Sequence, residues 1–234
     1  MICIPVVAAT QSEALQFIAR SAGLADILEL RMDLLADGNL KELFAVARSA
    51  APAVKILVTN RPRSSCAASD EQERVALLMD AVSRGADFVD LELATATVWR
   101  EKIKTLISAN QDRTRLILSH HDFCQTPSRR ELARIMNAAV RAGAQVTKIV
   151  TQACTREDNL AILSLIPSAR RRRHDIVAFC MGDQGKMSRV MAPFLGSLFT
   201  FAALEEGSES APGQLTVREM RQIWQAMGRE AACR

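Results

Sequence analysis

The chain has 234 residues, a formal net charge of +4, 49% hydrophobic residues and 24% charged residues. These proportions are typical of a folded globular protein and exclude disordered and fibrous classes. The charge is too small to indicate a nucleic-acid partner, and the longest uncharged run, residues 190–204, is too short to cross a membrane. The first residues lack the basic segment of a signal peptide, and the six cysteines form no Cys-x-x-Cys pair. We therefore expect a cytoplasmic protein with reduced thiols that binds neither nucleic acid nor membrane.

Short β-branched runs alternate with longer amphipathic segments along the whole chain. The strands we expect are residues 2–8, 25–31, 54–60, 88–93, 115–119, 145–150, 175–180 and 197–202. Apolar residues between them recur at the spacing of a helix, as at Val75, Leu78, Met79 and Val82. The capping-box pattern that begins many helices occurs at Thr10, Ser69, Ser128 and Thr216.

Eight strand–helix units, each of about 29 residues, predict a parallel sheet with right-handed crossovers. With no unit left over, this number favours a closed (β/α)8 TIM barrel over an open doubly wound sheet. No glycine-rich dinucleotide motif or P-loop occurs, and no break in composition divides the chain. We expect a single barrel domain over residues 1–234.

Charged residues occupy the ends of the predicted strands, where barrel enzymes build their active sites. Within an apolar strand, charges spaced by two share one face, and burying them without partners is costly. A functional cluster therefore explains them better than surface ion pairs do. The members are Glu29, Arg31 and Asp33 in the second unit, Arg61 in the third, Asp90 and Glu92 in the fourth, His121 in the fifth, Lys148 in the sixth and Arg189 in the seventh.

Lys148 is the candidate nucleophile, because it lies inside an apolar strand. Burial disfavours an ammonium, and a free amine is what attack on a carbonyl requires. Lys186 is the second choice, since its loop belongs to the same end of the barrel. The alternative is a structural lysine that forms an ion pair with Glu29, Asp90 or Glu92.

His121 is the candidate acid and base. Neighbouring strand residues face opposite sides, so only one of His120 and His121 enters the barrel mouth. A carboxylate such as Asp90 or Glu92 would orient the imidazole for proton transfer near neutral pH. A metal site at residues 120–124 is the weaker alternative, because consecutive strand residues rarely converge on one ion and no zinc spacing is present.

Three arginines at strand ends, Arg31, Arg61 and Arg189, predict a cationic pocket suited to a carboxylate. Residues 205–214, with their glycine, serine and proline content, predict a loop that closes over the ligand. The expected substrate is therefore a small anion.

Taken together, the motifs resemble the type I 3-dehydroquinate dehydratase family of the shikimate pathway. They cover most of the chain: Glu29-Leu-Arg-Met-Asp33, Thr59-Asn-Arg61, Asp90-Leu-Glu92, Ser119-His-His-Asp-Phe123, Lys148-Ile, Met181-Gly-x-x-Gly-x-x-Ser-Arg189 and Ser210-Ala-Pro-Gly-Gln214. The resemblance implies that Lys148 forms a Schiff base with the ketone of 3-dehydroquinate and that His121 moves the protons. It implies that Asp90 supports His121, with Glu92 nearby, and that no metal or organic cofactor takes part. The substrate carboxylate and hydroxyls would bind Glu29, Arg31, Arg61, Arg189, Ser210 and Gln214.

Two positions depart from the family pattern. Ser65 stands where an acid usually follows Arg61, and Ala8 and Ala9 stand where a substrate-contacting serine is common. Two other functions therefore stay open. One is another lysine-imine barrel such as a class I aldolase, and the other is a non-catalytic barrel that binds a shikimate-like acid. We also expect a homodimer through helical faces.

Overall fold

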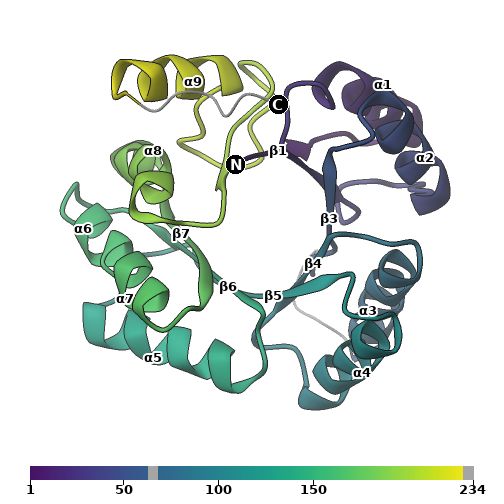
Figure 1. Ribbon diagram of the computed structural model, residues 1–234, viewed down its shortest axis with the longest axis horizontal. Coiled ribbons are helices and arrows are strands. Elements are labelled where there is room, and N and C mark those ends of the chain that lie inside the picture. Colours follow the sequence, from purple (N-terminus) through teal and green to yellow (C-terminus); the bar gives the residue numbers. More distant parts are fainter. Residues whose placement is uncertain (63–67, 229–234) are drawn as a thin grey trace.

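A computed structural model describes residues 1–62 and 68–228, with residues 68–70 described by their backbone alone. Eight parallel strands surround a central axis, and the helices form a ring outside them (Figure 1). The strands are β1 (Ile2–Val6), β2 (Ile27–Arg31), β3 (Lys55–Thr59), β4 (Phe88–Glu92), β5 (Arg115–Asp122), β6 (Val146–Gln152), β7 (Asp175–Met181) and β8 (Thr200–Phe201). Their hydrogen-bonded order is β7-β6-β5-β4-β3-β2-β1-β8, so β1 to β7 each pair with their neighbours in the sequence and β8 pairs with β1.

The strands are connected by helices at the outside of the barrel (Figure 1). They are α1 (Gln11–Ser21), α2 (Leu40–Ala50), α3 (Ala68–Ser83), α4 (Thr97–Ala109), α5 (Arg129–Arg141), α6 (Asp158–Leu163), α7 (Leu165–Arg171), α8 (Lys186–Leu195), α9 (Val217–Ala226) and the 3-10 turn η1 (Asp183–Gly185). Complete capping boxes begin α1 at Thr10 and α9 at Thr216. Ser128 caps α5 by accepting the Glu131 N–H, whereas the Ser69 side chain lies outside the described residues. In the described part of the chain, no helix is both long and apolar enough to cross a membrane.

The barrel is almost closed between β7 and the short β8. Leu198, just before β8, donates its N–H to the Ile176 carbonyl at 2.8 Å. The Ser197 hydroxyl donates to the same carbonyl at 3.2 Å. The predicted strand at residues 197–202 is therefore shortened to two residues, because Ser197 turns its side chain to the backbone of β7.

Alternate residues of the strands fill the interior in layers. The lower layer is apolar: Cys3, Ile27, Leu57, Phe88, Ile117, Val146, Val177 and Phe199 belong to one buried cluster. Two residues further along, the strands β2 to β6 contribute buried polar groups, namely Glu29, Thr59, Asp90, Ser119 and Lys148. At the corresponding step, β7 and β8 contribute Phe179 and Phe201. The buried polar side chains of this layer therefore come from β2 to β6. They lie closer to the C-terminal ends of the strands than the apolar layer does.

Candidate active site

A cavity of about 130 Å³ opens at the C-terminal ends of the strands. Its lining includes every predicted site residue except Asp33, Asp90 and Glu92. The lining residues are Glu29, Arg31, Arg61, His121, Phe123, Lys148, Val150, Phe179, Met181, Arg189, Phe201, Ser210, Ala211 and Gln214. Sequence positions as distant as 29 and 214 thus meet in one small volume.

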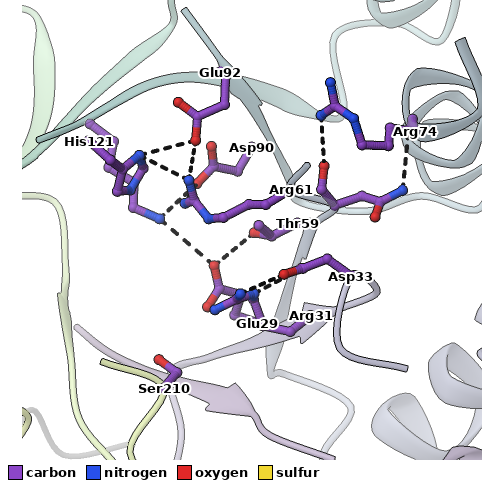
Figure 2. Close-up of polar contacts among 12 residues, drawn as sticks. Glu29, Arg31, Asp33, Thr59, Arg61, Arg74, Asp90, Glu92, His121 and Ser210 are labelled. Atoms are coloured by element: carbon purple, nitrogen blue, oxygen red, sulfur yellow. Dashed lines mark hydrogen bonds and ion pairs between the residues drawn. The ribbon is translucent and has the colours of Figure 1, made fainter. Parts of the chain in front are cut away.

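Lys148 is buried in this cavity among two carboxylates and an aromatic ring. Its Nζ lies 2.7 Å from Asp90 Oδ2 and 3.8 Å from Glu29 Oε1. The same nitrogen is 4.6 Å from the centre of the Phe201 ring. Glu29 is fixed in turn by the Thr59 hydroxyl, which donates a 2.7 Å hydrogen bond to it (Figure 2). The amine is therefore held at one place in the cavity.

Asp90 is an anion that forms an ion pair with Lys148. Burial alone would raise its pKa, but Lys148, Arg61 and His121 outweigh burial and hold that pKa well below its usual range. Arg61 Nη2 lies 3.3 Å from the carboxylate. Asp90 was expected to support His121, but the carboxylate that accepts a hydrogen bond from His121 Nδ1 is that of Glu92. Glu92 is two residues nearer the end of β4, at the depth where the imidazole lies.

His121 has its Nδ1 in a polar corner (Figure 2). Glu92 Oε1 lies 3.1 Å from Nδ1, and Arg61 Nη1 lies 2.9 Å from it. Arg61 also forms an ion pair with Glu92. Among the described residues, Nε2 has no hydrogen-bond partner, so this nitrogen is left for a ligand. The Phe123 ring stacks on the imidazole with centroids 5.9 Å apart.

The imidazole is neutral at neutral pH. Burial and the positive charge of Arg61 lower the pKa of His121 to about 4, although Glu92 acts in the opposite direction. In the tautomer that donates Nδ1–H to Glu92, the neutral imidazole can accept a proton at Nε2. The unprotonated ring is the form that a general base requires.

The three predicted arginines differ in their partners. Asp33, in the turn after β2, binds Arg31 with two hydrogen bonds of 3.0 and 2.6 Å, and Arg61 is paired with Asp90 and Glu92. Arg189 is fully buried and donates Nη2 to the Pro212 carbonyl at 3.2 Å. Within the part of the chain that the structure describes, its Nε and Nη1 have no partner. Burial lowers the pKa of Arg189 to about 10, which still leaves it charged at neutral pH.

Two orphaned donors on a buried cation are costly, because each unmade hydrogen bond carries a desolvation penalty of about 1–3 kcal/mol. Arg189 also lies over the Phe179 ring, with its guanidinium carbon 4.6 Å from the ring centre. Aromatic packing orients the guanidinium plane but supplies no acceptor for the two N–H groups. An anionic ligand in the cavity would supply them.

The loop that follows β8 forms one side of the cavity. Ser210 and Gln214 bind each other through two 3.0 Å hydrogen bonds. Gly182, after β7, donates its N–H to the Pro212 carbonyl at 3.0 Å. A side chain on Gly213, whose φ is +78°, would collide with the Gly182 backbone. The loop is therefore anchored to the end of β7, with its amide and hydroxyl facing the cavity.

Sequence reasoning missed the apolar side of the site, which comprises Phe123, Val150, Phe179, Met181, Phe201 and Ala211. Strand alternation could have found Val150, Phe179 and Met181, since each lies an even number of residues from an inward-facing position. The second-choice lysine, Lys186, is not in the cavity lining and forms an ion pair with Asp183 at 2.9 Å. Ser65 lies outside the described residues, and Ala8 and Ala9 do not line the cavity.

Comparison with known proteins agrees with this geometry. A family model described as type I 3-dehydroquinase matches residues 2–231. The chain belongs to the type I 3-dehydroquinase family. It is 33% identical over 225 residues to a 3-dehydroquinate dehydratase from Desulfotalea psychrophila, covering 95% of this chain and 96% of the relative. It is 32% identical over 230 residues to the 3-dehydroquinate dehydratase from Methanocaldococcus jannaschii, covering 97% and 99% of the two chains.

Solved structures of the type I 3-dehydroquinase family share the fold. The 3-dehydroquinate dehydratase from Geobacillus kaustophilus superposes with a TM-score of 0.81 at 26% identity, covering 96% of this chain and 91% of the other. The predicted TIM barrel is therefore confirmed. The predicted enzyme class, a type I 3-dehydroquinate dehydratase, is confirmed at the level of the family.

Proposed function

We propose that this enzyme dehydrates 3-dehydroquinate to 3-dehydroshikimate, a step of the shikimate pathway, through a Schiff base on Lys148. The observation that carries the proposal is that the buried Lys148, His121 and Arg189, the last with two donors that have no partner among the described residues, line the same small cavity. One cavity thus offers a nucleophile for a ketone, a base for a neighbouring carbon and a cation for a carboxylate.

The first step is attack of the Lys148 amine on the substrate ketone. Asp90, 2.7 Å from Nζ, takes the proton that frees the amine and returns it to the departing hydroxyl, so the carbinolamine loses water and gives an iminium ion, which withdraws electrons from the adjacent carbon–hydrogen bond. The iminium nitrogen carries a positive charge at the position where the Lys148 ammonium carried one. Asp90 and Glu29, at 2.7 and 3.8 Å from Nζ, therefore stabilise both states without moving.

The second step is proton transfer by His121. Neutral Nε2 takes the proton from the carbon next to the iminium, which leaves an enamine. The imidazolium then donates a proton to the departing hydroxyl, so that water leaves and a conjugated iminium remains. Glu92 at Nδ1 stabilises the transient positive charge on the ring. Hydrolysis of the iminium releases the enone and returns the Lys148 amine.

The remaining polar groups hold the substrate. Arg189 is a buried cation whose Nε and Nη1 have no partner among the described residues, so it can donate charge-assisted hydrogen bonds to the carboxylate. Ser210, Gln214, Glu29 and Arg31 all line the cavity, where they can bind hydroxyls. The apolar rings of Phe179 and Phe201 exclude water from the reacting carbon atoms.

One assay tests the function. Purified protein mixed with 3-dehydroquinate should produce the near-ultraviolet absorption of a conjugated enone, without added metal or cofactor. Borohydride added during turnover should attach substrate to Lys148 irreversibly. Binding without enone would favour the non-catalytic barrel, whereas turnover that requires a divalent metal ion would contradict the mechanism. A homodimer and a cytoplasmic location stay predictions, for which light scattering and fractionation are the tests.

A further inference from the structure

Two exposed thiols lie together outside the cavity. Cys124 follows β5 and Cys154 follows β6, the strands that carry His121 and Lys148. The Cys154 Sγ lies 3.4 Å from the carbonyl oxygen of Cys124. The catalytic proposal uses neither thiol, and the contact brings a nucleophilic sulfur next to the backbone of a second cysteine.

The two loops are fixed to each other beside this contact. Thr126 donates its hydroxyl to the Gln152 carbonyl at 2.8 Å and lies 2.9 Å from the Thr151 hydroxyl. The Cys154 N–H donates to Asp158 at 2.8 Å, and the Cys124 N–H donates to Asp122 at 2.9 Å. Proximity of the cysteines therefore belongs to the folded state and does not depend on a chance encounter of two loops.

The other described cysteines are less reactive toward oxidants. Cys3 and Cys180 are buried, and burial raises the pKa of each thiol. Since the thiolate is the reactive form, oxidation should select exposed cysteines. Cys124 and Cys154 are the exposed cysteines in residues 1–62 and 68–228.

We propose that Cys124 and Cys154 are a redox-sensitive pair that closes into a reversible disulfide on reaction with a hydroperoxide. One thiolate attacks the peroxide, whose O–O bond breaks to give a sulfenic acid and water or an alcohol. The second sulfur then displaces hydroxide from the sulfenic acid, and the thiol proton completes a water molecule. Two thiols are oxidised, one peroxide is reduced, and a dithiol reverses the bond by exchange.

Disulfide formation requires a small local rearrangement. The Cys154 thiol now contacts the carbonyl oxygen of Cys124, so the segment at Cys124 must turn to bring the two sulfur atoms to bonding distance. Phe123 precedes Cys124 directly and stacks on the His121 ring. The bond therefore displaces Phe123, which couples the thiol pair to the proposed acid–base group. This coupling rests on the proposed function, whereas the disulfide itself does not.

Peptide mapping tests the disulfide directly. The folded chain is treated with stoichiometric hydrogen peroxide, alkylated, digested without reductant and analysed by mass spectrometry. We expect a linked peptide pair that contains Cys124 and Cys154 and is lighter than the two reduced peptides by two hydrogen atoms. Cys124→Ser and Cys154→Ser should each abolish this pair. Pairing of either cysteine with Cys66 or Cys233 in preference, or sulfinic acid at both without a linked pair, would overturn the proposal.

Activity of the same samples tests the coupling. Oxidised wild-type protein should lose kcat/KM by roughly tenfold, because a displacement of about 1 Å near catalytic groups costs up to about 10²-fold, and dithiothreitol should restore it. Cys154→Ser should keep its activity before and after peroxide. A mapped disulfide with unchanged activity would overturn the coupling. If untreated protein forms no enone, the proposed function fails while the mapping still decides the disulfide.

Discussion

The Lys148 ammonium lies 2.7 Å from the Asp90 carboxylate, so the candidate nucleophile already has the counter-ion that its iminium would need. A second carboxylate, Glu92, lies 3.1 Å from His121 Nδ1. Two neighbouring acids on β4 thus serve two different groups. This division makes the two steps of the proposed reaction separable by mutation.

Glu92→Gln should slow proton transfer and leave imine formation intact. A charge-assisted hydrogen bond contributes about 1.5–3 kcal/mol, so we expect kcat to fall about 10- to 100-fold. Borohydride trapping of substrate should continue at the wild-type rate. The matched variant, Asp90→Asn, should reduce the rate of trapping itself. Equal effects of both variants on trapping would show that the carboxylates act as one unit.

Removal of the two central groups should stop the reaction at different stages. With Lys148→Ala no imine forms, so borohydride and substrate should leave the protein mass unchanged. With His121→Ala the amine remains, and borohydride should trap substrate while dehydration falls by about 10²–10⁴-fold. Lys186→Ala is the control and should behave as the wild type. An adduct that survives Lys148→Ala would exclude the mechanism.

The low pKa of His121 predicts a wide plateau of activity. Since the neutral ring is the base, kcat/KM should fall as the pH drops through about 4 and stay constant from there to neutral pH. Between about 4 and 6.5 the unfolded chain binds more protons at this residue than the folded chain does. The free energy of unfolding should therefore rise with pH across that window.

Proton NMR can follow this titration, because the chain has three histidines. The imidazole signal that disappears in His121→Gln assigns the residue. A midpoint near 6.5 for that signal would show that Arg61 and burial do not control the ring. Glu92→Gln should lower the midpoint further, since Glu92 raises the pKa of His121.

We expect Arg189 to be required for substrate binding and to lower the free energy of unfolding. Arg189→Met removes two orphaned buried donors, so the melting temperature should stay constant or rise. The same change removes the cation for the carboxylate, and kcat/KM should fall at least about tenfold. Arg171→Met, on the exposed end of α7, is the control and should alter neither quantity. Unchanged kcat/KM in folded Arg189→Met would remove this residue from the site.

The capping box of α9 should contribute measurably to folding. Thr216 accepts the Glu219 N–H and donates its hydroxyl to the Glu219 carboxylate at 2.8 Å. Thr216→Ala should lower the free energy of unfolding by about 1 kcal/mol. For a chain of this size, that corresponds to a fall of about 2–4 °C in melting temperature. Thr216→Ser keeps the hydroxyl and should retain most of the stability.

Sequence periodicity predicted the strands because a parallel barrel buries both faces of each strand. It failed where local hydrogen bonds override the pattern, as at Ser197, which shortens β8. The segment between β6 and β7 also divides into α6 and α7 at Ser164, whereas one helix per unit was expected. Propensity does not register such a break, because Ser164 itself keeps helical dihedral angles.

The alternation of side chains along the strands predicted that the candidate site residues on the strands meet at one end of the barrel. It did not predict which of them form ion pairs or hydrogen bonds with one another. Asp90 and Glu92 share a face in the sequence, and only their depth in the barrel decides that one binds Lys148 and the other His121. Asp33 was expected on the strand face with Glu29 and Arg31. It lies instead in the turn after β2, where its carboxylate binds Arg31. Depth and turn geometry depend on three-dimensional register, which period-2 alternation leaves undefined.

Because β8 is short, few backbone hydrogen bonds join it to the strands on either side of it. β8 pairs with β1 over two residues and is joined to β7 through Leu198, whereas β6 and β7 pair over seven residues. Amide deuterium uptake should therefore begin at this boundary, through partial openings that leave β2 to β6 closed. Lys148 and its carboxylates lie on β2, β4 and β6, each of which pairs with two neighbouring strands over three or more residues. The catalytic groups would then keep their positions, while the part of the cavity lined by Phe201 opens transiently to admit and release ligand.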